Sequence, residues 1–529
     1  MTHVFRRLLK LHLIISGVLV NLAVVAVLVF FGRSVYQLQL PFSVLAERVV
    51  MHLEGKSPAL SKRMNAGFSA LGIVNAGNTL YGKRYNIDPG GKNWRGWGAS
   101  SSVSFPPQSY GATGRPVIVE RNTGKQPTQY VHGASRDRRV RNVEELSRAI
   151  NTAMPGDRIL LAPGEYHISH AIGITHNGTV KRPVTVMAER LGQVRLLVSS
   201  TQGFLIRAPY WVFENLEMQG VCANDSACEH AYHIVGAGHG TVIRNNRLFN
   251  FNSMIKINGE MQSGRLQFPD NGLIESSSLY NRSVRDTDNP VTPIDIVAAN
   301  GWVIRNSLIA DFAKGRGDRT SYAAFAKGDA SGTLFERNVV ICQLNVHDDR
   351  DVRVGLSFGG GGTDRSACRD RRCSYEHSRG VIRNNVIMHC PSDVGIYLNK
   401  AHSAEIYNNT LYHTLGIDVR FPESTAVIFN NILSGRIDDR NGGLSIRKSN
   451  LIADFNNHLE GDVFHDWFQL PEAGNFNRVD GSEFVNRGQS RDELKYDFCG
   501  NLRKDNAVDI GAFEYSSARV CLPLGTINR

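Results

Sequence analysis

The sequence predicts an all-β protein: a right-handed parallel β-helix solenoid with an N-terminal helical cap, preceded by one transmembrane helix. Three observations predict it. A short motif with two polar residues between apolar ones recurs along the chain, one amphipathic helical pattern precedes the first repeat, and one long apolar run lies near the N-terminus. The 529 residues, of which 42% are hydrophobic and 21% charged, exclude a disordered chain and a polytopic membrane protein.

The apolar run near the N-terminus predicts a membrane helix. Residues 13–31 are interrupted only by Ser16, Gly17 and Asn21, and three basic residues precede them. About 20 apolar residues in a helix span a bilayer core, the basic residues favour a cytoplasmic N-terminus, and no small-residue cleavage site follows. We therefore expect a signal anchor in the inner membrane, with the main domain periplasmic or otherwise extracytoplasmic. A cleaved signal peptide is the alternative.

The chain behind the anchor divides into an irregular part and an ordered part. Residues 32–140 are rich in turn formers and show no sustained period, which predicts a stalk or irregular extension. From Val143 to Ala153 the apolar residues share one helical face, and a Pro155-Gly156 turn ends the pattern. The predicted domains are 1–12 (cytoplasmic), 13–31 (transmembrane), 32–140 (stalk), 141–515 (β-helix) and 516–529 (C-terminal tail).

The eight cysteines agree with export. No repeated Cys-x-x-Cys spacing indicates a metal site, and an even number of cysteines is typical of disulfides in an oxidising compartment. Unpaired buried cysteines are the alternative. The pairs expected from their positions are Cys222 with Cys228, Cys342 with Cys390, Cys368 with Cys373, and Cys499 with Cys521.

The repeated motif is exemplified by Val381-Ile-Arg-Asn-Asn-Val-Ile. Its second polar residue, here called the marker, recurs at positions 246, 277, 307, 338, 385, 409 and 431. The shortest steps, 22 and 24 residues, suit one coil of a parallel β-helix, and the longer steps, up to 47, indicate coils with inserted loops. Asn tolerates the left-handed conformation of a turn, and its side chain can bond to its equivalent in the next coil.

Several stretches carry a resemblance to known proteins. Val143-Glu-Glu-Leu, followed by Pro155-Gly-Asp-Arg-Ile, looks like an N-terminal cap, and Asp509-Ile-Gly-Ala-Phe-Glu-Tyr is similar to a terminal strand of secreted bacterial β-helices. The domain resembles the pectate-lyase-like superfamily, and most closely the chondroitinase-B-like and alginate-lyase-like enzymes of polysaccharide lyase family six. The resemblance implies a bacterial enzyme acting on carbohydrate, with Lys327 in Ala323-Ala-Phe-Ala-Lys-Gly-Asp as the base. The next strand, Val354-Gly-Leu-Ser-Phe, departs from the family, which has Arg there.

Polar side chains recur about 11 to 13 residues before the markers. On strands with apolar neighbours, alternation sends these side chains outward, and coils lie about 4.8 Å apart, so the side chains form a row on one outer wall. Lys256, on the strand-like stretch 254–258, is expected to join this row. The other members are His233, Asp295, Lys327, Tyr397 and Arg420.

The net charge of +11 favours an anionic partner, and an acidic polysaccharide fits a row that contains cations. Nucleic acid is not expected, because no basic tract with interleaved aromatics occurs. For β-elimination of a uronan, Lys327 is the expected base. Arg353, Arg420 or a bound Ca²⁺ is expected to neutralise the sugar carboxylate, and His233 or Tyr397 to protonate the leaving oxygen.

The remaining candidates bind substrate or metal. Lys256, Arg420 and Asp295 are expected to contact the substrate. Asp295 and Asp329, with the acidic loop 347–351, are candidate oxygen ligands for calcium. No other cofactor is expected.

Three other functions remain open from the sequence. A uronan C5-epimerase shares the proton abstraction, and a glycoside hydrolase would use two carboxylates, for which Asp295 and Asp329 are a candidate pair. A non-catalytic glycan-binding or envelope scaffold protein is the alternative from a different class, and the missing family Arg favours it.

Overall fold

The computed structural model describes residues 136–348, 350–360, 362–453, 463–479, 483–491, 493–503 and 508–515. The predicted cytoplasmic segment, the transmembrane helix at 13–31, almost all of the predicted stalk and the C-terminal tail lie outside these residues. Among the residues described, no helix is long and apolar enough to cross a membrane.

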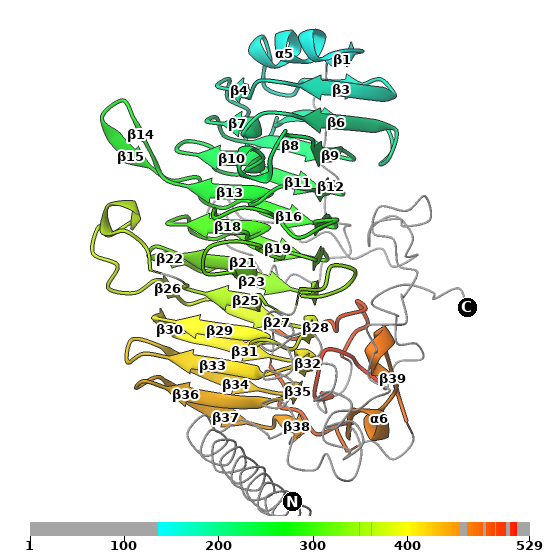
Figure 1. Cartoon of the computed structure of the whole chain (residues 1–529), viewed down its shortest axis with the longest axis vertical. Helices are drawn as coiled ribbons and strands as arrows, with labels where there is room; N and C mark the ends of the chain where they lie inside the picture. Colours follow the sequence, from blue (N-terminus) through cyan, green and yellow to red (C-terminus); the bar gives the residue numbers. More distant parts are fainter. Residues whose placement is uncertain are drawn as a thin grey trace, which may run out of the picture. The chain divides into compact units, whose positions relative to one another are not determined.

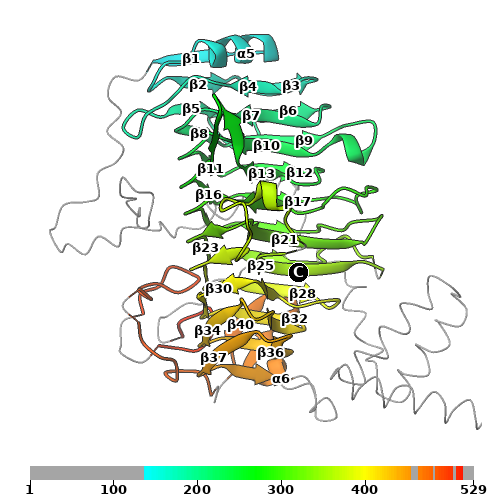
Figure 2. The same ribbon diagram turned by 90° about the vertical axis from the view of Figure 1, so that its left-hand side faces the viewer.

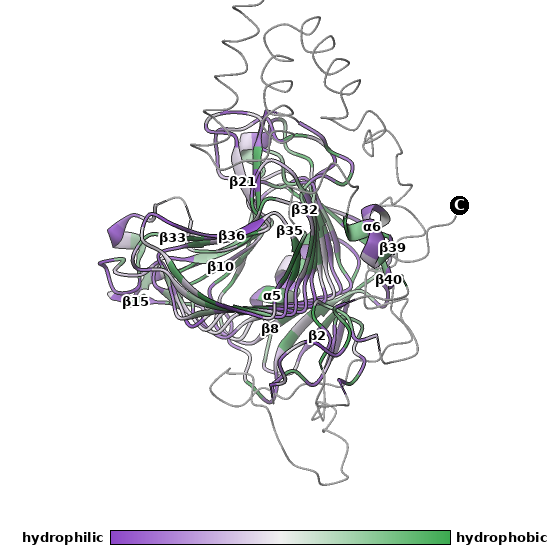
Figure 3. Ribbon diagram, turned by 90° about the horizontal axis from the view of Figure 1, so that it is seen from below, coloured by the Kyte–Doolittle hydropathy of each residue, from purple (hydrophilic) through white to green (hydrophobic). Residues whose placement is uncertain are grey.

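Three long parallel sheets form the domain, and successive coils add strands to each of them (Figures 1 and 2). Seen along the stack, the strands superpose around a hydrophobic interior (Figure 3). This arrangement fits the predicted right-handed parallel β-helix, because crossovers between parallel strands are almost always right-handed. The large step between markers 338 and 385 contains an inserted loop, as the spacing predicts.

Sheet 1 has twelve strands, listed in spatial order. They are β1 (Asp137–Val140), β2 (Arg158–Leu161), β5 (Val184–Met187), β8 (Trp211–Glu214), β11 (Val242–Arg244), β16 (Leu273–Glu275), β19 (Val303–Arg305), β23 (Leu334–Glu336), β27 (Val381–Arg383), β31 (Ala404–Tyr407), β34 (Thr425–Phe429) and β37 (Leu444–Lys448).

Sheet 2 has ten strands. They are β4 (Ile172–Ile174), β7 (Gln202–Ile206), β10 (His230–Val235), β13 (Ile255–Asn258), β18 (Ile294–Val297), β21 (Thr320–Lys327), β25 (Val352–Phe358), β29 (Ile396–Asn399), β33 (Gly416–Arg420) and β36 (Arg436–Arg440).

Sheet 3 has eleven strands. They are β3 (Gly164–Ile168), β6 (Val194–Val198), β9 (Glu217–Gly220), β12 (Arg247–Phe249), β17 (Ser278–Tyr280), β20 (Leu308–Ala310), β24 (Val339–Ile341), β28 (Val386–Cys390), β32 (Thr410–Thr414), β35 (Ile432–Ser434) and β38 (Leu451–Ala453).

Short elements complete the described fold. They are the helices α5 (Val143–Asn151) and α6 (Val463–Trp467), the 3-10 turns η2 (Asp225–Ala227), η3 (Arg365–Ala367) and η5 (Pro471–Ala473), and the strands β14 (Glu260–Gln262), β15 (Arg265–Gln267), β22 (Ala330–Ser331), β26 (His377–Ser378), β30 (Ala401–His402), β39 (Phe468–Leu470) and β40 (Asn475–Arg478).

The predicted helical cap is confirmed. Helix α5 is capped at its N-terminus by Asn142, whose side chain accepts a hydrogen bond from the Glu145 amide, and it buries Leu146, Ala149 and Ile150. These apolar side chains cover the first coil, whose interior would otherwise face water. The strand β1 lies within the stretch that the sequence assigned to the stalk, and it pairs with β2 as the first strand of sheet 1.

The turn and the side-chain ladder predicted for the Asn motif are both present, but they are made by two different residues of the motif. The residue before each marker has positive φ, as at Asn245, Asn384 and Asn430. The marker side chains are buried and bond along the stack, with Nδ2 of Asn385 donating to Oδ1 of Asn409 at 2.9 Å, and Asn409 donating to Asn431 at 2.9 Å. Each marker oxygen also accepts the backbone N–H of the marker above, so the buried turn leaves few polar groups unpaired.

Three predicted disulfides are confirmed: Cys222–Cys228, Cys342–Cys390 and Cys368–Cys373. Cys499 is also disulfide-bonded, and its predicted partner Cys521 lies outside the described residues. Cys342 and Cys390 join consecutive coils of sheet 3 at the ends of β24 and β28, which supports the register that the markers predict.

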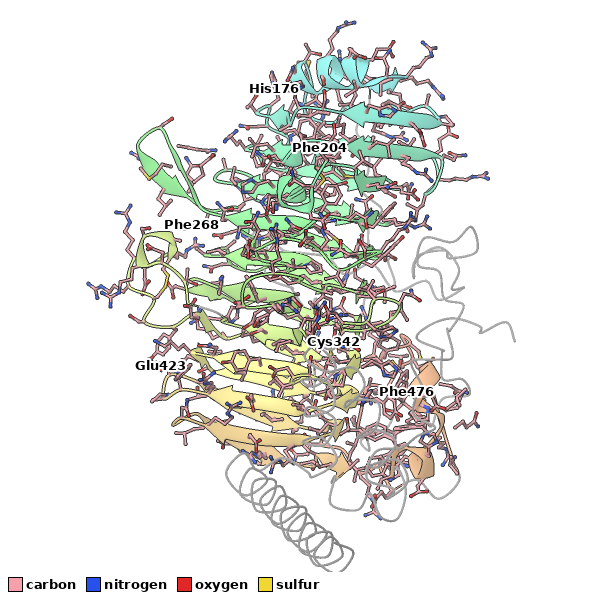
Figure 4. All side chains as sticks on the ribbon, in the orientation of Figure 1. His176, Phe204, Phe268, Cys342, Glu423 and Phe476 are labelled. Carbon is pink, nitrogen blue, oxygen red and sulfur yellow. A yellow bond between two sulfur atoms is a disulfide. The ribbon has the colours of Figure 1, made fainter. Side chains whose placement is uncertain are left out.

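The chain after β38 packs on the outer side of sheet 3. Aromatic residues of this segment, among them Phe464, Phe468 and Phe476, share one hydrophobic cluster with outward residues of β20, β24 and β28. Figure 4 labels Phe476 on this side of the solenoid. Sheet 3 is therefore partly covered, whereas sheet 2 carries the polar residues that the sequence singled out.

Candidate functional site

The outer side of sheet 2 carries two adjacent rows of side chains. Strand register places the first row, called the polar row, on successive strands from β10 to β33. Its members are His233, Lys256, Asp295, Phe325, Ser357, Tyr397 and Asp418. Two residues further along the strands, the second row contains Lys327 on β21, Asn399 on β29, Arg420 on β33 and Arg440 on β36. The predicted members therefore share one face, in two rows rather than one.

The spacing to the markers explains the two rows. Residues 12 or 13 before a marker, such as His233, Asp295 and Tyr397, belong to the polar row. Lys327 and Arg420 lie 11 before their markers and fall in the second row, because a shift of two residues along a strand keeps a side chain on the same face.

Lys256 and Asp295 form an ion pair at the upper part of this face. The Lys256 Nζ lies 2.6 Å from Oδ2 of Asp295, whose side chain is only 5% exposed. The other carboxylate oxygen, Oδ1, is buried and accepts no hydrogen bond. A buried carboxylate oxygen without a hydrogen-bond donor raises the free energy of the folded state. This atom is therefore suited to accept a hydrogen bond from a group that becomes a donor during a reaction.

Lys327 lies one coil below Asp295 and is half-buried. Its Nζ lies 4.4 Å above the ring of Phe325, and within the part of the chain that the structure describes it makes no hydrogen bond or ion pair. Burial lowers the pKa of its ammonium, the charge of Lys256 lowers it further, and the carboxylates of Asp295 and Glu376 oppose both. The net direction is downward, which favours the neutral amine that a base requires.

The residue after Lys327 is held on both sides by an inserted loop. This loop, residues 362–376, follows β25 and contains the Cys368–Cys373 disulfide. Gly328 donates its N–H to Oε2 of Glu376 at 2.8 Å and accepts the N–H of Arg369 at 3.0 Å. The peptide groups beside the lysine are therefore fixed by the loop.

The same loop is anchored to a second insertion, the β14–β15 hairpin. The guanidinium of Arg369 lies 2.7 Å from Asp270 and 4.4 Å from the ring centre of Phe268, just beyond the hairpin. Both insertions project from the same side of the solenoid in Figure 1, and Figure 4 labels Phe268 there. They flank the C-terminal ends of the sheet 2 strands, where Lys327 lies.

Strict alternation fails at the start of β21 and β25. Tyr322 and Phe325, three residues apart, touch edge to face with ring centres 5.4 Å apart, and Tyr322 packs with Val354 and Tyr397. Tyr322 therefore lies on the outer face, half-buried, with its hydroxyl pKa raised by burial and by neighbouring Tyr397. Its outward position is not predicted by the sequence, because alternation counted from Lys327 sends residue 322 inward.

The same shift corrects the expectation for Arg353, the register partner of Ser321. Its side chain is fully buried, with Nε 2.7 Å from Asp351 and a further hydrogen bond to the carbonyl of Val346. The guanidinium thus stabilises the loop before β25 and is closed to a sugar carboxylate in this structure. Its role as a neutralising cation is not compatible with that position.

His233 lies at the top of the polar row, three strands from β21. Its Nδ1 lies 2.6 Å from the Gln202 amide and its Nε2 2.8 Å from the Asn258 amide, while burial lowers its pKa. Three coils correspond to about 14 Å. The structure therefore does not bring His233 to Lys327, and both of its nitrogens are already occupied by side chains.

The lower part of the face has a different composition. Arg420 donates to the hydroxyl of Tyr397 at 3.1 Å, and Arg440 pairs with the buried Asp418. Burial, together with Asp393 and Asp438, raises the pKa of Asp418 to about 6 in spite of Arg440. Neither Asp418 nor Asp393 was singled out by the sequence analysis, although Asp418 lies 13 residues before its marker, as His233 does.

The predicted calcium ligands that the structure describes lie near cations rather than grouped together, and Asp349 of the acidic loop lies outside the described residues. Asp295 is paired with Lys256, and the groups that act on the Asp329 pKa are Asp370, Arg369 and Arg379 rather than Asp295. In the acidic loop, Asp348 pairs with Arg350 and Asp351 with Arg353. No group of three or more His, Cys, Asp or Glu side chains in the described ranges has the geometry to hold a metal ion.

No protein-family model and no curated protein matches this chain. Solved structures do match. Pectate lyase Pel9A is 15% identical over 73% of this chain and 98% of its own, with a TM-score of 0.42. The PL6 family polysaccharide lyase from Pseudopedobacter saltans (16%, covering 60% and 93%, TM-score 0.32) and the GH136 lacto-N-biosidase from Eubacterium ramulus (12%, 60% and 67%, 0.41) also match.

The two groups to which the sequence was likened, pectate lyases and family six lyases, thus recur among the matches. The matches also include a glycosidase. Similarity at this distance says nothing about the reaction, because one fold hosts many activities. Any statement about function therefore rests on the side chains of sheet 2.

Proposed function

We propose that this protein cleaves an acidic polysaccharide by β-elimination on the outer face of sheet 2, with Lys327 as the base. The observation that carries the proposal is the position of Lys327: a half-buried amine with a lowered pKa, next to an ion pair but not part of it. Structural lysines normally reach a carboxylate or open water, whereas this one is held over Phe325 with its neighbours already paired.

The neighbouring groups suit the other steps of the reaction. Removal of the C5 proton builds negative charge on the sugar carboxylate, and Lys256, whose charge acts on Lys327, remains partly exposed on this face. Tyr322 keeps its proton because its pKa is raised, and it contacts the ring on which Lys327 rests. We assign the transfer of a proton to the leaving oxygen to the Tyr322 hydroxyl.

A neighbouring carboxylate is available to stabilise the protonated form of the base. After abstraction, Lys327 carries a positive charge, and the Asp295 carboxylate favours that charged form, although burial keeps the net pKa of the ammonium lowered. The buried Oδ1 of Asp295, which has no hydrogen-bond donor, is suited to stabilise that charge. Asp295 then acts as a positioning residue for Lys327 rather than as a metal ligand.

The proposal includes export and a membrane anchor. The three disulfides of the described residues fit an oxidising compartment, since such bonds are rare in a reducing cytosol. With the helix expected at 13–31, we propose a bacterial inner-membrane anchor and a periplasmic domain. Fractionation of cells followed by carbonate extraction tests this: the full chain should stay with the inner membrane and be digested by protease added to spheroplasts.

One observation favours a second candidate, a glycoside hydrolase. Asp418 is buried with a pKa of about 6 and lies near Asp393, and a carboxyl of raised pKa beside a second carboxylate is typical of the acid and base of such enzymes. A hydrolase would place the reaction on the lower part of the face, away from Lys327. A C5-epimerase would use Lys327 as a lyase does, but would return a proton to C5.

The test uses the full-length chain in detergent, incubated with alginate, polygalacturonate and chondroitin. A lyase raises the absorbance near 235 nm, because elimination creates an unsaturated sugar. Lys327→Ala should lower the rate by roughly 10²- to 10⁴-fold, the range of a lost general base. Lys181→Ala, at an exposed lysine far along the stack from β21, is the matched control and should act as wild type.

The other outcomes separate the alternatives. New reducing ends without absorbance that survive Lys327→Ala and vanish in Asp418→Asn would establish the hydrolase. Solvent deuterium at C5 without chain cleavage would establish the epimerase. Binding of a uronan without any of these products would leave the scaffold function and overturn the enzymatic proposal.

A further inference from the structure

We propose that Arg420 and Tyr397 form a distal saccharide subsite that binds the carboxylate of a sugar several residues away from the cleavage point. The substrate then runs along the solenoid, from the β21 coil toward the β33 coil, and a stretch of about four consecutive sugars is recognised. This inference rests on the proposed function, because it takes Lys327 as the place of reaction.

Arg420 is the uncommitted cation of this region. Among the described residues it has no ion pair: it donates only to the Tyr397 hydroxyl, its Nε is buried without an acceptor, and its guanidinium lies 4.7 Å from the Phe421 ring centre. The neighbouring Arg440, one strand further, is neutralised by Asp418. A planar guanidinium stacked on a ring and short of acceptors is suited to a planar carboxylate.

Polar groups around Arg420 can hold the rest of a sugar ring. Tyr397 also accepts a hydrogen bond from the Asn399 amide at 3.2 Å, so its hydroxyl is held in place. Asp418 and Asp393 add carboxylate character below, which suits sugar hydroxyls and opposes a second anionic group on the same sugar. The ligand class is therefore a uronic acid residue with free hydroxyls.

The distance sets the length of chain that is read. β21 and β33 are three strands apart in sheet 2, which corresponds to about 14 Å. One sugar advances a linear glycan by roughly one coil spacing, so the carboxylate bound by Arg420 belongs to the third sugar from the one at Lys327. Between them, the polar row of the β25 coil carries the small residue Ser357, whose buried hydroxyl donates to the carbonyls of Gly359 and Tyr397, so this coil adds no charged side chain to the polar row.

The inference predicts a dependence on substrate length that the base alone does not. Di- to octasaccharides of guluronate, mannuronate and galacturonate are titrated calorimetrically into the Lys327→Ala variant, which binds without turnover. Affinity should rise steeply at about the tetrasaccharide and level off. Arg420→Gln should weaken binding of the hexasaccharide by roughly tenfold or more, the value of a lost charge-assisted hydrogen bond, and leave the disaccharide unchanged.

Two controls distinguish the subsite from general effects. Arg478→Gln makes the same chemical change on the exposed β40 strand and should alter nothing. Arg420→Lys keeps the charge but loses the fork, and should fall between wild type and Gln. Dextran sulfate, a polyanion without uronate, should displace the hexasaccharide to the same extent from the Arg420→Gln and Arg420→Lys variants.

The outcomes also separate this inference from the proposed function. Equal losses for di- and hexasaccharide in Arg420→Gln, with an unchanged melting temperature, would overturn the distal subsite while leaving the lyase intact. A length-dependent loss of binding in a protein that cleaves nothing would overturn the lyase and support the subsite. Binding that is insensitive to Arg420 at every length would overturn the inference outright.

Discussion

Charged residues run in rows along two faces of this solenoid, one on sheet 1 and one on sheet 2, and they differ in how completely they are paired. On sheet 1, register aligns Arg244, Glu275, Arg305, Glu336 and Arg383 on successive strands, here called the charge ladder. Its signs alternate, and the ion pairs Arg244–Glu275, Arg305–Glu275 and Arg383–Glu336 are 2.6–2.8 Å long. The polar row on sheet 2 and its companion row contain a lysine and an arginine, Lys327 and Arg420, without any carboxylate partner in the described chain.

The difference teaches how to tell a structural charge from a functional one. A buried charge of the charge ladder that has its counter-charge one coil away is desolvated and closed to a ligand, whereas Lys256, although paired with Asp295, remains 22% exposed and can still reach one. A half-buried cation without a partner raises the free energy of the folded state, which is the usual signature of a site. The number of charges does not distinguish the charge ladder from the rows on sheet 2, whereas the presence or absence of an ion-pair partner does.

The comparison is tested most severely by removing a charge from each row. Glu336 is buried, pairs with Arg383 at 2.8 Å, and has its pKa lowered to about 2 by the surrounding arginines, although burial alone would raise it. Glu336→Gln should lower the free energy of unfolding by roughly 3–5 kcal/mol, because it leaves buried guanidinium groups without a counter-charge. Urea unfolding followed by circular dichroism at pH 7 measures this.

Lys327→Met makes the corresponding change on sheet 2, where the opposite effect on stability is expected. It removes a half-buried charge without a partner, so the melting temperature should stay the same or rise while activity is lost. Glu165→Gln, which breaks the exposed pair with Arg195 (3.3 Å apart), is the control and should cost at most about 1 kcal/mol. If Lys327→Met destabilised the fold as much as Glu336→Gln, the two rows would not differ in the way described.

A second prediction concerns the ion pair beside the base. Removal of Asp295 takes away the carboxylate that raises the Lys327 pKa, so Asp295→Asn should move the acidic limb of the kcat/KM profile to lower pH. Removal of Lys256 takes away a cation that lowers the same pKa and also frees Asp295, so Lys256→Met should move the limb to higher pH. Shifts of about one unit correspond to about 1.4 kcal/mol.

The opposite directions are what matter here. A purely structural loss would lower the rate at every pH without moving the limb, and a loss of substrate binding would change KM alike in both variants. Shifts in the same direction would contradict the assignment of Lys327 as the group whose titration limits the rate.

Much of the fold could be predicted from the sequence because its determinants are local and repeated. The marker motif recurs in every coil from 246 to 431, with Ser at 277 and 307 and Asn elsewhere, so each occurrence reinforces the register of the next, and the ladder of Asn385, Asn409 and Asn431 follows from it. The disulfide between Cys342 and Cys390 could be placed by counting from the markers. Lys327, Asp295 and Tyr397 were placed on the correct face for the same reason.

The parts that were missed depend on irregular backbone and on long-range contacts. The shift in alternation after Tyr322 turned Arg353 inward and Tyr322 outward, and no local pattern signals it. Glu376, which lies near Lys327, belongs to an inserted loop whose position is set by Arg369 and Asp270, residues 99 apart in sequence. The sequence shows that a loop is inserted but not what it contacts.

The smallest predicted effect lies at the foot of the polar row, where Asp418 departs from both patterns: it is buried and paired with Arg440, yet its pKa is raised. A carboxyl with a pKa of about 6 when folded and about 3.9 when unfolded binds its proton more tightly in the folded state. Its contribution to stability is therefore fully present below pH 4 and is lost as the pH rises through 6.

Asp418→Asn cannot titrate, so the melting temperature of the variant relative to wild type should rise by a few degrees between pH 4 and pH 7. A difference that stays constant over this range would mean that Arg440 holds the carboxylate ionised throughout. Asp418 would then be one more paired charge, like those of the charge ladder, and the hydrolase candidate would lose its acid.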